Sequence, residues 1–200
     1  MFALVESGSI TKMLNGNRGI TLNDLQYPRA IYTLWTEAER NVIGIYTVEI
    51  DETNKKDEKW YINTNITYAF GSGKVTGSYG TATAKAHADT LWTAQDETDG
   101  LGTEGEVATR GLKYNLIQTV KAQAAGLLAE TDWYITRKSE KNTAIPSAIT
   151  THRNAVRSKQ AAMETAITNA SDTVALETLY TATKQDDGTV ARPLGQLPTL

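Results

Sequence analysis

The sequence predicts an α+β protein with a β-rich first half, a helical second half and an extended C-terminal arm. Before residue 106, turn-forming glycines and asparagines separate short segments rich in β-branched and aromatic residues. After it, the chain is rich in alanine, and apolar residues recur every three or four positions. After residue 184, two prolines and two glycines prevent a regular helix. We therefore expect a β-rich domain over 1–105, an α-helical domain over 106–184 and an arm over 185–200.

The first half is expected to form a hairpin or a small antiparallel sheet with one short helix. A first strand is expected within residues 1–10, and a turn follows at 15–19. Residues 45–50 and 59–70 mostly alternate apolar with polar side chains, which predicts two strands paired as a hairpin. A turn at 71–73 leads into 74–91, where further strand is expected, with helix over 82–91 as the alternative.

A capping box predicts the short helix. The Thr36 hydroxyl can accept from the backbone N–H of Glu39, whose carboxylate can accept from Thr36 in return. The helix should run over 37–43, and Gly44 is placed to end it.

An acidic, glycine-rich segment at 96–106 is expected to link the two halves as a mobile loop. Its carboxylates do not have the spacing of an EF-hand calcium loop, so a solvated loop is the favoured interpretation.

Helical periodicity defines the second half. An apolar stripe starts at Leu112 and continues through Leu116, Val120, Ala124 and Leu127. Thr131-Asp132 is expected to cap a turn that carries Trp133 and Tyr134. Pro146 is expected to open another helix, and Ser171-Asp172 to cap the last one. One apolar side on each helix predicts a helical hairpin or small bundle, with Arg153 and Arg157 away from the apolar side.

The arm carries Leu194, Leu197 and Leu200 at a spacing of three. This pattern suits docking onto another subunit, and a frayed terminus is the alternative.

Catalytic, metal-binding and cofactor-binding residue sets are all missing from the sequence. There is no cysteine, and the two histidines, His87 and His152, lack partners at metal-ligand spacing. Gly71-Ser72-Gly73-Lys74 lacks the earlier glycine and the following Ser or Thr of a phosphate loop. We therefore expect a protein that is not an enzyme and that holds no cofactor or metal.

Charge and hydropathy exclude two classes of partner. A net charge of −3 does not favour nucleic acid, which requires a clustered basic surface. No apolar run approaches the ~20 residues of a membrane span, and a charge at Glu6 comes too early for a signal peptide. Synthesis in a cytoplasm, with neither nucleic acid nor membrane as partner, is the expectation.

Two stretches resemble a known family. Leu127-Leu128-Ala129-Glu130-Thr131-Asp132-Trp133, with Arg153 and Arg157 after a proline-opened helix, resembles the C-terminal segment of tail-fibre-assembly-type proteins of tailed bacteriophages. Tyr27-Pro28-Arg29 and the segment from Leu34 to Tyr46 look like the N-terminal part of the same proteins.

The resemblance implies a structural or connector protein in the tail, baseplate or tail-fibre attachment region of a virion. Its partners would be other tail or fibre proteins, and it would form a homo-oligomer within a symmetric assembly. The alternative is an assembly chaperone that is not retained in the virion. A carboxylate-based glycan hydrolase is a third, less favoured hypothesis. The residues expected to make contacts are Trp133, Arg153, Arg157, Leu194, Leu197 and Leu200. Trp133 is also expected to fill the helical core, and an arginine to pair with Asp132 or Glu130.

Overall fold

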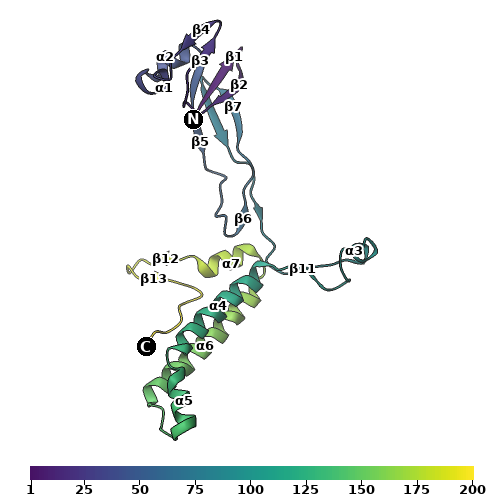
Figure 1. The fold of residues 1–200 in the computed structure, drawn as a ribbon, viewed down its shortest axis with the longest axis vertical. Coiled ribbons are helices and arrows are strands. Elements are labelled where there is room, and N and C mark those ends of the chain that lie inside the picture. Colours follow the sequence, from purple (N-terminus) through teal and green to yellow (C-terminus); the bar gives the residue numbers. More distant parts are fainter. The chain divides into compact units, whose positions relative to one another are not determined.

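The computed structural model describes residues 1–200 and divides into two compact units, Met1–Thr83 and Ala84–Leu200 (Figure 1). The first unit is built on a β-sheet and the second on helices, so the predicted α+β class is confirmed.

The division between the units lies earlier than the boundary predicted after residue 105. Hydrogen bonds explain the difference, because the backbone just after Ala84 is tied to the helices. The Thr173 hydroxyl donates to Lys85 O at 2.7 Å, and the N–H of Leu112 donates to Ala86 O at 3.0 Å.

A curled five-stranded sheet organises the first unit. Its strands lie in the order β2-β1-β5-β8-β7, and the edge strands β2 and β7 contact each other. The pairs are antiparallel except β5 with β8, which is parallel. The bounds of the unit's elements are β1 Phe2–Glu6, β2 Ser9–Leu14, β3 Ile20–Leu22, β4 Leu25–Tyr27, α1 Ile31–Leu34, α2 Glu37–Val42, β5 Ile45–Asp51, β6 Tyr61–Ile62, β7 Thr67–Gly71 and β8 Lys74–Ser78, with β9 at Thr83–Ala84.

Three two-residue turns set the local pairing. They are Ser7-Gly8, Asn23-Asp24 and Ser72-Gly73, and all six residues have positive φ. Two central residues with positive φ define the type I′ turn, whose twist matches that of the paired strands. Short-range sequence therefore fixes the hairpins β1-β2, β3-β4 and β7-β8.

The predicted hairpin between 45–50 and 59–70 is wrong. β5 pairs with β1 and β8, and the predicted second strand is divided into β6 and β7. The tight turn at Ser72-Gly73 makes β8 the hairpin partner of β7, and β8 then fills the place beside β5. The helix considered for 82–91 does not form, since β9 and β10 (Thr90–Leu91) occupy that segment.

Strand β1 buries side chains on both of its faces. Leu4 packs in one cluster with Ile31, Tyr32 and Ile45, whereas Ala3 and Val5 pack in another with Val75. This follows from the two-residue period of a strand, and it places β1 at the centre of the unit's core.

The predicted capping box at α2 is confirmed. Thr36 N donates to Glu39 Oε2 at 2.7 Å, and Glu39 N donates to Thr36 Oγ1 at 3.3 Å. The Thr36 backbone N–H is the largest cause of a lowered pKa at Glu39. Gly44 ends the helix with φ +80, and a Cβ there would lie 2.7 Å from Val5 O. Glycine is therefore required at this close approach to β1.

Two long helices, α4 (Leu112–Ala129) and α6 (Ser147–Asn169), lie side by side in the second unit (Figure 1). From the predicted stripe, Leu116, Val120 and Ala124 are buried on α4, and Val156, Met163 and Ile167 are buried on α6. The other elements of the unit are α5 Asp132–Lys141, α7 Thr173–Tyr180, β12 Thr183–Lys184 and β13 Val190–Ala191. Asp172 caps α7 as predicted, accepting from Ala175 N at 2.8 Å.

The segment predicted as a linker is instead an ordered part of the second unit. β10 pairs with β11 (Val107–Thr109), and α3 (Ala94–Thr98) lies between them with a capping box at Thr93 and Asp96. Gly102 lies against the Trp92 ring so closely that a Cβ would meet it at 2.3 Å. The segment was expected to be mobile because it is acidic and rich in glycine, and composition does not reveal the contact between Gly102 and Trp92. We call residues 90–109 the acidic excursion.

Candidate functional site

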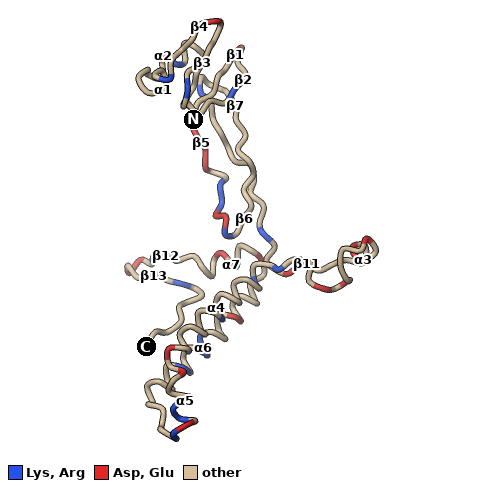
Figure 2. The backbone as a smooth tube through the Cα atoms, in the orientation of Figure 1, with Lys and Arg blue, Asp and Glu red and all other residues tan.

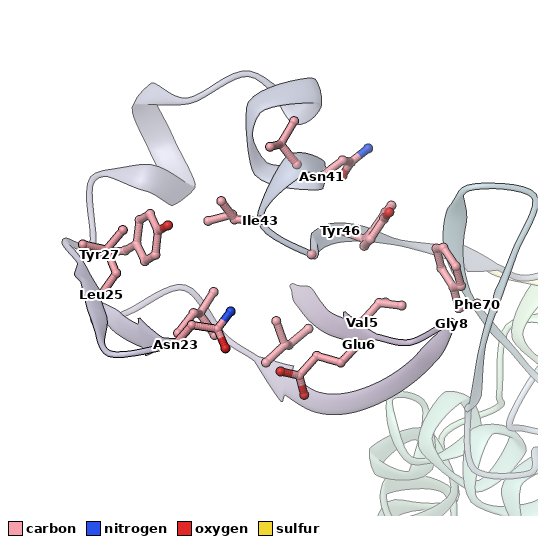
Figure 3. Close-up of a pocket in the computed structure, with 14 residues that line it drawn as sticks. Val5, Glu6, Gly8, Asn23, Leu25, Tyr27, Asn41, Ile43, Tyr46 and Phe70 are labelled. Carbon is pink, nitrogen blue, oxygen red and sulfur yellow. The ribbon is translucent and has the colours of Figure 1, made fainter.

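The first unit contains a groove of about 570 Å³. Its lining comes from β1, the β3-β4 hairpin, the end of α2, β5 and β7, and comprises Leu4, Val5, Glu6, Gly8, Leu22, Asn23, Leu25, Tyr27, Asn41, Val42, Ile43, Gly44, Tyr46 and Phe70. Figure 3 shows Tyr27 and Leu25 on one side of the groove and Tyr46 and Phe70 on the other.

Two turns with positive φ build this groove. The Asn23-Asp24 turn closes the β3-β4 hairpin that forms one wall, and Gly44 brings the end of α2 against β1. The Val5 N–H donates to Gly44 O at 2.8 Å, which fixes this approach. Sequence reasoning identified Gly44 as a helix end but missed the groove, although Asn23-Asp24 was an available turn signal.

The lining of the groove combines exposed apolar side chains with polar groups. Leu25 and Val42 are highly exposed, at 57% and 86%, and Glu6 is the single charged residue in the lining. One carboxylate without a second acid, a histidine or a lysine does not make a general acid–base pair. The Asn41 side chain is satisfied locally, since in its favoured orientation it donates to Ile45 O and Glu37 O.

Trp133 lies at the surface of α5 rather than in the core. Its side chain is 52% exposed and stacks on Tyr134, with 3.8 Å between ring centroids. The Arg137 guanidinium lies 4.7 Å from the Trp133 centroid and 5.2 Å from that of Tyr134. The prediction that Trp133 fills the core is therefore wrong, because α5 has no buried residue and turns this side to solvent.

Arg153 is buried, contrary to the expectation that it faces away from the apolar side. Its Nη1 donates to Thr131 Oγ1 at 2.6 Å and to Leu128 O at 2.7 Å, and its Nη2 donates to Asp132 Oδ1 at 2.8 Å. The predicted pairing of an arginine with Asp132 is confirmed. The Thr131 side chain makes no cap bond to α5, because its oxygen serves Arg153 instead. This geometry leaves Arg153 unavailable to a partner.

The other expected contact residues are spread over the second unit. Arg157 is exposed on α6. Leu194 is buried within the chain, where its N–H donates to Leu179 O at 3.0 Å, and Leu197 lies beside Gln123 and Leu127 of α4. Leu200 is 72% exposed. The first part of the arm therefore folds back on the unit's own helices.

The remaining sequence candidates do not form a site. His152 is buried on α6, His87 precedes β10, and Gly71-Ser72-Gly73-Lys74 forms the β7-β8 hairpin turn. No group of three or more His, Asp or Glu side chains is placed to hold a metal ion.

None of the helices combines the length and apolar character needed to cross a membrane. No protein-family model matches the chain, and no curated protein and no solved structure shows a significant similarity to it.

Proposed function

We propose that this chain is a structural or connector protein of a tailed-bacteriophage virion, in the tail, baseplate or tail-fibre attachment region. It acts through protein–protein contacts and without catalysis. The phage assignment rests on the resemblance of the segments around Thr131-Asp132-Trp133 and Leu34–Tyr46. The proposed role in protein–protein contact rests on the large exposed surface area of the chain.

The exposed area is the observation that carries this proposal. The chain exposes 12937 Å² for a mass of 21.8 kDa. A compact monomer of that mass exposes about 9,300 Å², and two separate compact domains of these sizes about 11,000 Å². The value for two separate domains already allows for units that make no contact with each other, and the chain exposes more than that value. This additional surface is area on which the chain can contact neighbouring subunits.

The groove of the first unit is a suitable contact surface. Its exposed rim residues Leu25 and Val42, together with Tyr27, Tyr46 and Phe70, would cover an apolar segment of another tail protein. Such a contact requires no chemistry from Glu6.

Mass spectrometry of purified virions tests the assignment. We expect the chain in the particle at a fixed ratio to the other tail proteins. Its presence in infected cells together with absence from the particle would contradict the virion role and favour the alternative, a fibre-assembly chaperone that is released.

A groove variant tests the contact surface. Val42→Glu combined with Leu25→Glu should reduce incorporation into particles, because two charges would be buried at the contact. Leu34→Glu is the matched control, since Leu34 is 80% exposed in the same unit and lies outside the groove. Equal incorporation of the groove variant and the control would exclude the groove as the contact.

A further inference from the structure

The surface of α5 presents the three residue types that dominate binding hot spots. Trp133 and Tyr134 stack on each other, and the Arg137 guanidinium lies over both rings. We call these three residues the α5 platform. The two rings and the guanidinium already contact one another. Little further side-chain entropy would therefore be lost by these three residues when a partner binds them.

The charge of the α5 platform favours an acidic partner. Arg137, Lys138 and Lys141 are the cations of α5, and Asp132 and Glu140 its carboxylates. The charge of Asp132 is balanced by buried Arg153 at 2.8 Å, so Glu140 is the one carboxylate of α5 that opposes the three cations. No carboxylate forms an ion pair with Arg137.

The acidic excursion has the complementary character. It contains Asp96, Glu97, Asp99, Glu104 and Glu106 and no lysine or arginine. Figure 2 shows negative charge without positive charge around α3, and both positive and negative charge on α5, where cations outnumber carboxylates by three to two. Exposed apolar side chains accompany these carboxylates, with Leu91 at 49%, Leu101 at 60% and Val107 at 37% exposure. The leucines of the acidic excursion can pack against Trp133 of the α5 platform, while its carboxylates attract Arg137.

The two surfaces are anchored at opposite ends of α4, and α3 and α5 lie apart in the chain (Figure 1). The excursion is anchored at the start of α4, where Gly111 N donates to Asp89 Oδ1 at 2.8 Å and Arg110 pairs with Asp89 at 2.6 Å. The platform begins directly after the end of the same helix. The 18 residues of α4 separate them by about 27 Å at 1.5 Å per residue.

We infer that the α5 platform of one copy binds the acidic excursion of a second copy. The contact joins two different surfaces, so it is head-to-tail, and repetition gives a ring if the rotation closes and a filament if it does not. This inference does not depend on the virion assignment.

Sedimentation velocity on the full chain tests self-association. Concentrations from about 1 μM to about 1 mM cover the affinities of weak and moderate contacts. We expect species larger than a monomer at about 50 mM salt and weaker association at about 500 mM, because exposed ion pairs are screened. A monomer at every concentration in low salt would overturn the inference.

Charge reversal tests the pairing. Lys138→Glu with Lys141→Glu, and separately Glu104→Lys with Glu106→Lys, should each weaken association by about tenfold or more. None of these four side chains makes a hydrogen bond or ion pair that holds the fold, so circular dichroism should show folded variants. The chain with all four changes should associate again. Failure of this rescue would overturn the pairing even if each double variant weakens association.

Two further variants separate the platform from a general charge effect. Trp133→Ala should weaken association by about tenfold or more, as expected for a hot-spot residue. Arg18→Glu with Arg29→Glu, at exposed positions of the first unit, matches the net-charge change of the platform reversal and should leave association unchanged. An equal loss in this control would overturn the inference, since net charge alone would then explain the effect.

Discussion

Arg153 donates to the carboxylate of Asp132 at 2.8 Å and, through its other terminal nitrogen, to the last turn of α4. The two residues come from different helices, α6 and α5, so one guanidinium joins three helices. A cation at the Leu128 carbonyl also complements the negative end of the α4 dipole.

Arg153→Ala should destabilise the helical unit by about 2–3 kcal/mol, because it removes the three hydrogen bonds of a buried guanidinium, one of them to the Asp132 carboxylate. Urea unfolding followed by helical circular dichroism measures this change. Arg157→Ala is the matched control on the same helix, and its exposed side chain should give a change within about 0.5 kcal/mol. Equal effects of the two substitutions would contradict the bridging role of Arg153.

Thr36→Ala should destabilise the first unit by about 1 kcal/mol, since it removes the acceptor for the Glu39 N–H. Trp35 is adjacent, so its fluorescence during denaturation reports the effect. Thr36→Ser keeps the hydroxyl and should behave much like the parent chain. A loss as large in the serine variant as in the alanine variant would show that the capping oxygen is not responsible.

Acid should weaken the anchor of the acidic excursion at Asp89. The Gly111 backbone N–H, and then Arg110, hold the pKa of Asp89 below its ordinary value of 3.8. A carboxylate with a lowered folded-state pKa stabilises the fold fully above its unfolded-state pKa and loses that contribution as the pH falls through the folded value. The difference in unfolding free energy between the parent chain and Asp89→Asn should therefore be constant near neutral pH and shrink below about pH 3.8. A difference unchanged down to strongly acidic pH would exclude an electrostatic role for Asp89.

Leu194→Ala should destabilise the helical unit by about 2–3 kcal/mol, because Leu194 is 6% exposed and its removal leaves a cavity. Leu200→Ala should change the stability by less than about 0.5 kcal/mol, since Leu200 is 72% exposed. Thermal unfolding by circular dichroism distinguishes the two. If Leu194→Ala were neutral, the arm would not be docked on the chain's own helices.

Local sequence was sufficient for the features that depend on neighbouring residues. The α+β class, the capping box at Thr36, the cap at Asp172 and the stripe along α4 follow from periodicity and from hydrogen bonds over three or four positions. An ion pair of Arg153 or Arg157 with Asp132 or Glu130 was also expected across a helical hairpin, and the pair that forms is Arg153–Asp132.

Tertiary structure alone decided the pairings between distant residues. The alternation of apolar and polar side chains predicted a strand at 45–50, but this pattern does not specify which strands pair with it. In the structure β5 lies between β1 and β8. The same limit applies to the sides of α5 and α6. Trp133 is exposed and Arg153 buried because burial depends on where a second helix packs, and hydrophobicity along one helix does not specify that position.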